Sequence, residues 1–241
     1  MKSPFFMLLL GAVLGTAALA QQTAPKKKAA APKAPDPAYA QIVDTPGLPR
    51  VLLLGDSISL GYTLGVRAAL QGAANVHRPA ENCGETARGL RSLDKWLGTG
   101  KWDVIHFNFG LHDLKYLDAA GKYVPPDQGK QVAPVAAYEA NLRELVARLR
   151  RTGAKLVFAT TTPVPEKSQG RVARDELAYN TAAVRVMREL GVAVNDLHAA
   201  VLPQLAAWQR PNNVHFTPAG SAGLAEAVVA AVRAQLPQAQ P

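Results

Sequence analysis

A serine and a distant histidine are the residues of this chain best suited to chemistry. Ser57 follows an apolar run, Val51–Leu54, within the triplet Gly55-Asp56-Ser57. His215 lies far downstream, just before the last helix-like segment. A serine hydroxyl becomes an effective nucleophile only when a neighbouring base takes its proton, and histidine is the commonest base of this kind. The pair therefore suggests nucleophilic catalysis by serine, provided that the fold brings the two side chains together.

The elements that must position this pair are short apolar runs that alternate with helix-like segments. Val51–Leu54 is almost continuously apolar, which is typical of a strand buried on both faces. Four more strands are expected at Val76, Val104–Phe109, Ala154–Thr160 and Val192–Val194. Helices are expected over Leu60–Leu70, Glu85–Leu97, Val135–Arg151, Val172–Leu190 and from Pro218 to about Leu236. This alternation predicts a five-stranded parallel sheet with helices on both faces.

Polar residues follow most of the expected strands. Ser57 comes after the first strand, Asn82–Glu85 after the second, Gly110–Asp113 after the third and Asp196 after the fifth, while His215 precedes the last helix. In open α/β sheets the ligand crevice lies beyond the carboxyl ends of the strands. These residues are therefore expected to meet at one edge of the sheet.

On these residues the chain resembles the SGNH (GDSL-type) hydrolases over roughly residues 48–236. The first block of that family matches Gly55-Asp56-Ser57, and its second-block glycine matches Gly84. The third block matches Gly110-Leu111-His112-Asp113, and the fifth matches Asn212-Asn213-Val214-His215. The resemblance implies a flavodoxin-like three-layer α/β/α sandwich with a five-stranded parallel sheet, in agreement with the strand pattern.

The resemblance also implies roles for individual residues. Ser57 is the implied nucleophile and His215 the implied base, acting through an acyl-enzyme in ester hydrolysis. The backbone N–H groups of Ser57 and Gly84, together with the side chain of His112, are the implied oxyanion hole. Asp56, Gly110 and Asp113 are expected to support the site. This chemistry requires no cofactor and no metal.

Two positions depart from the family pattern. His112 stands where the family has asparagine, but an imidazole N–H can donate a similar hydrogen bond. Asn212 stands where the family has the acid that orients the histidine, and an amide oxygen can take over that task, as it does in papain-like enzymes. The group that orients His215 is left open between Asn212, Asp196 and a backbone carbonyl.

The amino-terminal residues predict export. Lys2, an apolar stretch over Phe5–Leu14 and the ending Ala18-Leu19-Ala20 are typical of a secretory signal peptide cleaved after Ala20, with an uncleaved anchor helix as the alternative. Residues 21–47 are Ala, Pro and Lys rich and are expected to form a disordered linker, which leaves a domain over 48–236 and a flexible tail over 237–241. The expected location is secreted or periplasmic, where the basic linker is able to touch anionic envelope polymers weakly.

Composition argues against several other classes of function. The chain has a formal net charge of +9, but its basic residues are spread over helix-like segments without interleaved aromatic residues, so nucleic acid binding is not favoured. Cys83 is the single cysteine, which excludes an internal disulfide and is best interpreted as a small buried residue. The five histidines show no metal-binding spacing.

The leading hypothesis is an exported serine esterase that acts on O-acyl, and most simply O-acetyl, esters of a small molecule or carbohydrate. A lipolytic esterase or thioesterase is the alternative within enzymes. The alternative outside enzymes is an envelope carbohydrate-binding protein with weak catalysis on the same scaffold. The acyl group, the alcohol and the oligomeric state are left open by the sequence.

Overall fold

A computed structural model describes Met1 and residues 36–237. The expected signal peptide, most of the expected linker and the last four residues lie outside the described residues. Within residues 36–237 the core is a five-stranded sheet in the order β2-β1-β3-β6-β7, and every neighbouring pair is parallel. Its strands are β1 (Arg50–Leu54), β2 (Asn75–His77), β3 (Val104–Phe107), β6 (Lys155–Ala159) and β7 (Ala193–Asn195). The five strands predicted from apolar runs are thereby confirmed.

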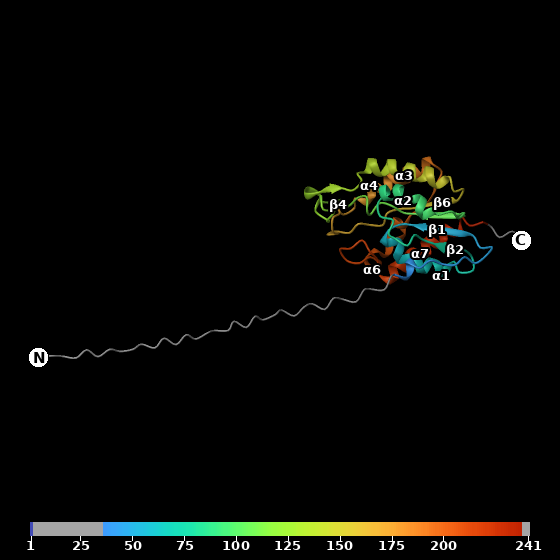
Figure 1. Cartoon of the computed structure of the whole chain (residues 1–241), viewed down its shortest axis with the longest axis horizontal. Coiled ribbons are helices and arrows are strands. Elements are labelled where there is room, and N and C mark those ends of the chain that lie inside the picture. Colours follow the sequence, from blue (N-terminus) through green and yellow to red (C-terminus); the bar gives the residue numbers. More distant parts are fainter. Residues whose placement is uncertain (2–35, 238–241) are drawn as a thin grey trace. The chain divides into compact units, whose positions relative to one another are not determined.

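Helices cover both faces of this sheet. They are α1 (Ser57–Ala69), α2 (Thr86–Leu97), α3 (Val135–Arg150), α4 (Glu176–Glu189), α5 (Leu197–Val201), α6 (Leu205–Trp208) and α7 (Pro218–Arg233). Figure 1 shows α1 and α7 on one side of the strands and α2, α3 and α4 on the other, and contacts join α1 to α7, α2 to α3 and α3 to α4. The predicted three-layer α/β/α sandwich is confirmed.

The helical periodicity of the sequence explains how these layers adhere. On α3, Leu142, Leu145, Val146 and Leu149 are all fully buried, and these are the residues spaced for one face. The strands are buried on both faces, as their continuous apolar runs predict: Val51, Leu53 and Leu54 have no exposed surface. Each fully buried Leu or Val side chain contributes roughly 1.5–3 kcal/mol to folding.

Several short elements were not predicted. β4 (Tyr116–Leu117) and β5 (Lys130–Gln131) form a small antiparallel sheet in the long connection after β3. Residues 36–237 also contain 3₁₀ turns at Pro37–Tyr39, Pro126–Gln128 and Leu202–Gln204. α4 begins at Glu176 rather than near Val172, because Arg174 has a φ of 68°, which a helix does not allow.

The predicted start of the domain requires correction. Residues 36–47 do not behave as a linker, because Ala38 is buried and the backbone N–H of Thr45 donates to Oδ1 of Asn75 at 2.8 Å. The carboxylate of Asp44 pairs with Arg50 at 2.8 Å and with His77. The folded domain therefore begins near Asp36 rather than at residue 48. No helix among the described residues is both long and apolar enough to span a bilayer.

The strand order determines where a site can form. From β1 the chain moves outward to β2 and then returns to the other side of β1 to form β3. Such a reversal leaves a crevice at the carboxyl ends of the two strands that flank it. Ser57 follows β1 and Gly110–Asp113 follow β3, so both segments lie at this reversal.

Candidate active site

Ser57 occupies the first position of α1, directly after the turn that leaves β1. Asp56 is the N-cap of this helix, and its buried carboxylate accepts the N–H of Ile58 at 2.9 Å. Gly55 is required in the turn, since a Cβ there would lie 2.8 Å from Cβ of Ser59. The turn therefore holds the Ser57 hydroxyl at a helix N-terminus, where backbone N–H groups lack helical acceptors and favour negative charge.

The structure brings Ser57 and His215 together. Oγ of Ser57 lies 2.8 Å from Nε2 of His215, which is a normal hydrogen-bond distance. The loop that carries His215 is held at both ends, because Arg210 N–H donates to the His215 carbonyl at 2.9 Å and Thr217 N–H donates to the Trp208 carbonyl at 2.7 Å. Thr217 then caps α7, so the histidine sits on an anchored loop directly before a helix.

The other nitrogen of His215 contacts Asn213, and not Asn212, one of the three groups left open by the sequence as the orienting partner. Oδ1 of Asn213 lies 2.7 Å from Nδ1 of His215 and 2.9 Å from the backbone N of the same residue. A backbone N–H only donates, so the atom facing it must be the amide oxygen, and Nδ1 must then carry the ring proton. Nε2 is consequently free to accept the proton of Ser57. Asn212 instead forms the turn, with a φ of 54°.

Burial keeps His215 neutral. Desolvation lowers the pKa of His215 below its usual value of 6.5; nearby Arg210 and Arg171 also lower it, and Asp56 acts in the opposite direction. Deprotonated imidazole is the form that a general base requires. The site therefore presents a base at neutral pH although no carboxylate of residues 36–237 contacts the ring.

His112 lies in the turn after β3, and Lys115 defines its protonation state. Nζ of Lys115 is 3.2 Å from Nδ1 of His112. An ammonium group has only donors, so Nδ1 must accept and the ring proton must be on Nε2. Burial lowers the pKa of His112, and the charges of Lys115 and Arg171 lower it further, against the opposing effect of Asp56 and Glu85. His112 is thereby a neutral imidazole with one N–H donor at Nε2.

The backbone of Gly84 already has a hydrogen-bond partner. Gly84 has a φ of 66°, and its N–H donates to Oδ1 of Asn82 at 2.9 Å. To bind an oxyanion, this N–H would have to share or exchange the Asn82 acceptor. The N–H of Ser57, at the first position of α1, is under no such constraint from the helix.

Asp113 and Gly110 connect the loops of the site. Oδ1 of the fully buried Asp113 accepts both the backbone N–H and the hydroxyl of Thr86, the first residue of α2. Burial raises the pKa of Asp113 to about 7. Gly110 has a φ of 147°, and a Cβ there would lie 2.0 Å from Oγ1 of Thr161. The turn after β3 is thus fixed against α2 on one side and against the segment after β6 on the other.

Asp196 does not orient His215, which corrects that alternative. It is the N-cap of α5, where its Oδ1 accepts the Thr160 hydroxyl at 2.8 Å and the Ala199 N–H at 3.0 Å. The remaining histidines also have structural partners: His77 pairs with Asp44, His106 with Asn195 at 3.1 Å and His198 with Glu176 at 3.2 Å. Residues 36–237 contain no group of three or more His, Cys, Asp or Glu side chains that could hold a metal ion.

A cavity of about 300 Å³ opens beside His215. Its lining comes from three loops and includes Tyr123, Arg171, Asn213 and the segment Lys167–Gln169. The residues lining it are mostly polar or charged, which suits a small polar substrate.

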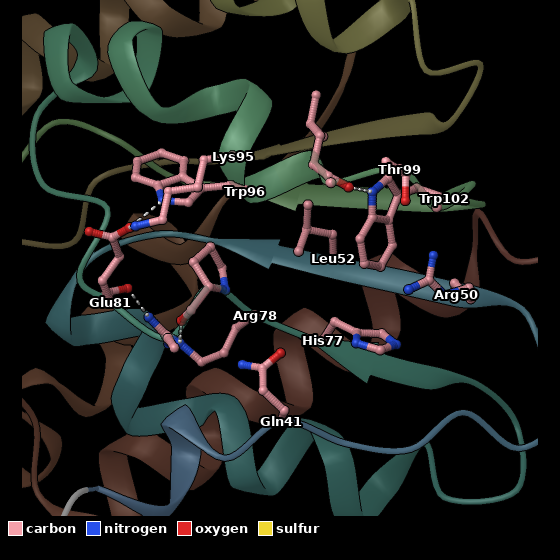
Figure 2. A pocket seen from close by; sticks show the side chains of 15 residues that line it. Gln41, Arg50, Leu52, His77, Arg78, Glu81, Lys95, Trp96, Thr99 and Trp102 are labelled. Carbon is pink, nitrogen blue, oxygen red and sulfur yellow. Dashed lines mark hydrogen bonds and ion pairs between the residues drawn. The ribbon is translucent and has the colours of Figure 1, made fainter.

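A second cavity, of about 530 Å³, lies at the start of β1 and the end of α2 and contains none of the candidate catalytic residues (Figure 2). Within it, Glu81 accepts from the ammonium group of Lys95 at 2.8 Å and from the indole N–H of Trp96 at 2.9 Å. The buried Arg78 donates to Ser59 and Thr63 of α1, both at 3.1 Å. These bonds serve to hold α1 and α2 against the sheet.

Four residues around the site escaped the sequence analysis: Lys115, Ser168, Arg171 and Asn213. Asn213 belongs to the fifth block and Lys115 follows the third block by two residues, so their proximity to the site was readable although their contacts were not. Ser168 and Arg171 belong to a loop after β6 without periodicity or motif, and no feature of the sequence marks them.

Comparisons with known proteins show the family to which the chain belongs. The model of the GDSL-like Lipase/Acylhydrolase family matches residues 53–222. No curated protein sequence matches the chain. Among solved structures, a lipase/acylhydrolase from Enterococcus faecalis is 20% identical with a TM-score of 0.64, over 80% of this chain and 100% of that chain.

An acetylxylan esterase from Geobacillus stearothermophilus is 20% identical with a TM-score of 0.61, over 76% of this chain and 94% of that one. At these identities the solved structures establish a shared fold. The family model adds the activity class, because it extends from the strand before Ser57 into α7, beyond His215. The chain belongs to the GDSL-like lipase/acylhydrolase family and is a carboxylic ester hydrolase of the SGNH type.

Proposed function

We propose that this protein is an exported serine esterase that removes O-acetyl or similarly short acyl groups from a polar alcohol, such as a carbohydrate. The observation that carries the proposal is the hydrogen-bonded series from Oγ of Ser57 to Nε2 of His215, at 2.8 Å, and from Nδ1 of His215 to Oδ1 of Asn213, at 2.7 Å. Each proton in this series has the position that base catalysis requires.

Acylation begins when Oγ of Ser57 attacks the ester carbonyl and its proton passes to Nε2 of His215. The carbonyl oxygen becomes an oxyanion, which accepts the N–H of Ser57 and Nε2–H of His112. The N–H of Gly84 becomes a third donor to the oxyanion if it gives up its hydrogen bond to Asn82. Removing one donor of this kind typically reduces turnover by roughly 10²–10³-fold. The protonated His215 then donates to the leaving alcohol as the carbon–oxygen bond breaks.

Deacylation repeats these steps with water. His215 takes a proton from the water, whose oxygen attacks the acyl carbon of the Ser57 ester. The same donors bind the second oxyanion. The proton returns from His215 to Oγ of Ser57 as the carboxylic acid leaves, which restores the free enzyme.

The small size and polar lining of the cavity favour a short acyl group and a polar alcohol over a lipid chain. Two of the similar solved structures are described as acetyl xylan esterases, which supports the same substrate class. Export rests on the amino-terminal signal-like segment and is tested by finding the protein, cleaved after Ala20, in the secreted or periplasmic fraction.

A fluorophosphonate and an ester panel test the proposal together. The folded wild type should be labelled, Ser57→Ala should not, and Ser92→Ala, which removes a hydroxyl on α2, should be labelled like wild type. In a panel from acetyl to long-chain esters of simple and carbohydrate alcohols, the rate should be highest for acetyl. Highest rates on long-chain esters or on thioesters would instead support the lipolytic esterase or thioesterase alternative. A folded protein that is never labelled yet binds carbohydrate would overturn the enzyme proposal.

A further inference from the structure

The cavity beside His215 contains a cation without a carboxylate partner. Arg171 is half-buried, with its Nε donating to the Leu111 carbonyl at 2.9 Å and its Nη1 to the Gln169 carbonyl at 3.3 Å. Its guanidinium lies over the ring of Tyr123, 5.6 Å from the centroid. Among the described residues, no carboxylate forms an ion pair with it. Its charge is thus oriented by neutral groups and left available to a ligand.

The electrostatics of Arg171 agree with this geometry. Burial lowers the pKa of Arg171, and Asp56 and Tyr123 oppose that effect. Asp56 is committed to capping α1, where it accepts from Ile58 N–H. A half-buried guanidinium that has no direct counter-charge gains a charge-assisted hydrogen bond when an anion pairs with it.

A second residue lining the same cavity, Ser168, has a side chain without any hydrogen-bond partner among the described residues. Ser168 is 6% exposed, and its Oγ has no hydrogen-bond partner among residues 36–237. Buried hydroxyls nearly always have a partner. Ser168 lines the cavity and its covered Oγ makes no hydrogen bond, so this hydroxyl is free to turn towards a ligand atom. Lys167, the preceding residue, is exposed on the rim and has a φ of 60°, an uncommon conformation for a non-glycine residue.

From these groups we propose that the cavity is a subsite for a carboxylate carried by the ester substrate. This inference rests on the proposed esterase function. Arg171 would bind the carboxylate through its guanidinium, Ser168 would donate its hydroxyl and Lys167 would add charge at the rim. Because His215 lines the same cavity, the carboxylate belongs close to the scissile ester. It comes either from the acyl part, as in a hemiester of a dicarboxylic acid, or from the alcohol part, as in an acetylated uronic acid.

Two matched pairs of esters distinguish these sources. The first pair is 4-nitrophenyl propionate and 4-nitrophenyl hemisuccinate, which differ by a carboxylate in the acyl part. The second is an acetylated methyl glucoside and the corresponding acetylated methyl glucuronide, which differ in the alcohol part. We expect the wild type to favour the charged member of one pair by about tenfold or more in kcat/KM. This preference should fall as salt is added.

Variants show whether the preference belongs to this cavity. Arg171→Met and Ser168→Ala should each lower the ratio of kcat/KM between charged and neutral esters, whatever happens to the absolute rates. Ser168→Ala is the cleaner variant, because it breaks no hydrogen bond of the protein and should not lower the melting temperature. Lys155→Met, an exposed charge at the amino-terminal end of β6, is the control and should keep the ratio.

The outcomes separate this inference from the esterase proposal. If the wild type hydrolyses the neutral and charged members of both pairs equally, the proposed carboxylate subsite is wrong, while the proposed esterase activity is supported. If no ester is hydrolysed and the fluorophosphonate does not label Ser57, the esterase is wrong. Whether the cavity binds a carboxylate is then tested by titrating glutarate and glucuronate into the folded protein. Saturable binding that weakens in Arg171→Met supports a carboxylate site, and no binding overturns it.

Discussion

Nζ of Lys115 lies 3.2 Å from Nδ1 of His112, so a lysine determines which nitrogen of that histidine carries the proton. Asparagine, the family residue at this position, presents an amide N–H without any such help. Histidine has two tautomers, and only the one protonated at Nε2 leaves a donor on the nitrogen opposite Lys115. Lys115 is therefore a positioning residue that acts through His112 in the proposed mechanism.

Replacing Lys115 with methionine should leave His112 free to adopt either tautomer. We expect this change to lower kcat by roughly tenfold, while KM changes little. Lys115→Gln should restore much of the loss, because the glutamine amide also has N–H groups to donate to Nδ1. The ¹⁵N chemical shifts of the His112 ring measure the tautomer directly. Lys122→Met, in the same connection after β3, is the matched control. Equal kcat in the methionine and glutamine variants would show that Lys115 matters for packing or charge instead.

Asn213→Asp should raise the pKa of His215, because a carboxylate at Nδ1 stabilises the imidazolium and a neutral amide does not. His215 is an effective base only when deprotonated, so activity should fall on acidification through a pKa below 6.5 in the wild type. In Asn213→Asp that acidic limb should shift upward by about one pH unit or more. The measurement is the pH dependence of kcat/KM.

Asn213→Ala should lower kcat by roughly 10²–10⁴-fold, since it removes the only acceptor found at Nδ1 within the described residues. Asn212→Asp is the informative comparison. Since Asn212 forms a left-handed turn and makes no such contact, this variant should leave the pH profile in place. A shift of the profile in Asn212→Asp and none in Asn213→Asp would reverse the assignment.

The sequence was sufficient for the sheet and for the placement of Ser57, because both follow from patterns that burial imposes. A continuous apolar run becomes a central strand, and a residue directly after it must lie at the carboxyl edge. Asn212 and Asn213 show where this reasoning ends. Which of two adjacent asparagines reaches Nδ1 depends on one backbone angle, the φ of 54° at Asn212, and composition does not encode that angle.

Loop contacts were equally out of reach of the sequence. Arg171 meets the site because its Nε bonds to the Leu111 carbonyl, sixty residues away in the chain, and no periodicity predicts such a contact. The assignment of residues 36–47 to the linker is wrong for a different reason, which lies in the sequence itself: the composition of the chain changes at residue 36. Unlike the Ala/Pro/Lys-rich stretch before them, these residues contain no Lys and include Tyr39, Ile42 and Val43. Contacts such as that of Thr45 with Asn75 attach them to the domain.

Deleting residues 1–47 should therefore destabilise the domain, and deleting 1–35 should not. The shorter deletion keeps Ala38 buried and keeps Asp44 with Arg50 and His77. The longer one removes these contacts and also leaves the Asn75 side chain without its Thr45 partners. The expected loss is about 2–4 kcal/mol in the free energy of unfolding, measured by urea denaturation. Equal midpoints of urea unfolding for the two shortened proteins would mean that residues 36–47 do not stabilise the domain.

Asp113 should make the domain less stable as pH rises through the weakly acidic range. Burial raises the pKa of its carboxyl to about 7 from an ordinary value near 4, so the folded state holds a proton that the unfolded state releases. Its contribution is complete below pH 4, declines as the pH rises towards 7 and is then lost, and amounts to at most about 4 kcal/mol. Asp113→Asn keeps an oxygen for Thr86 and cannot ionise. The melting temperature of this variant, minus that of the wild type, should therefore increase from pH 4 to pH 8. A difference that stays flat over this range would mean that Asp113 is ionised in the folded protein throughout.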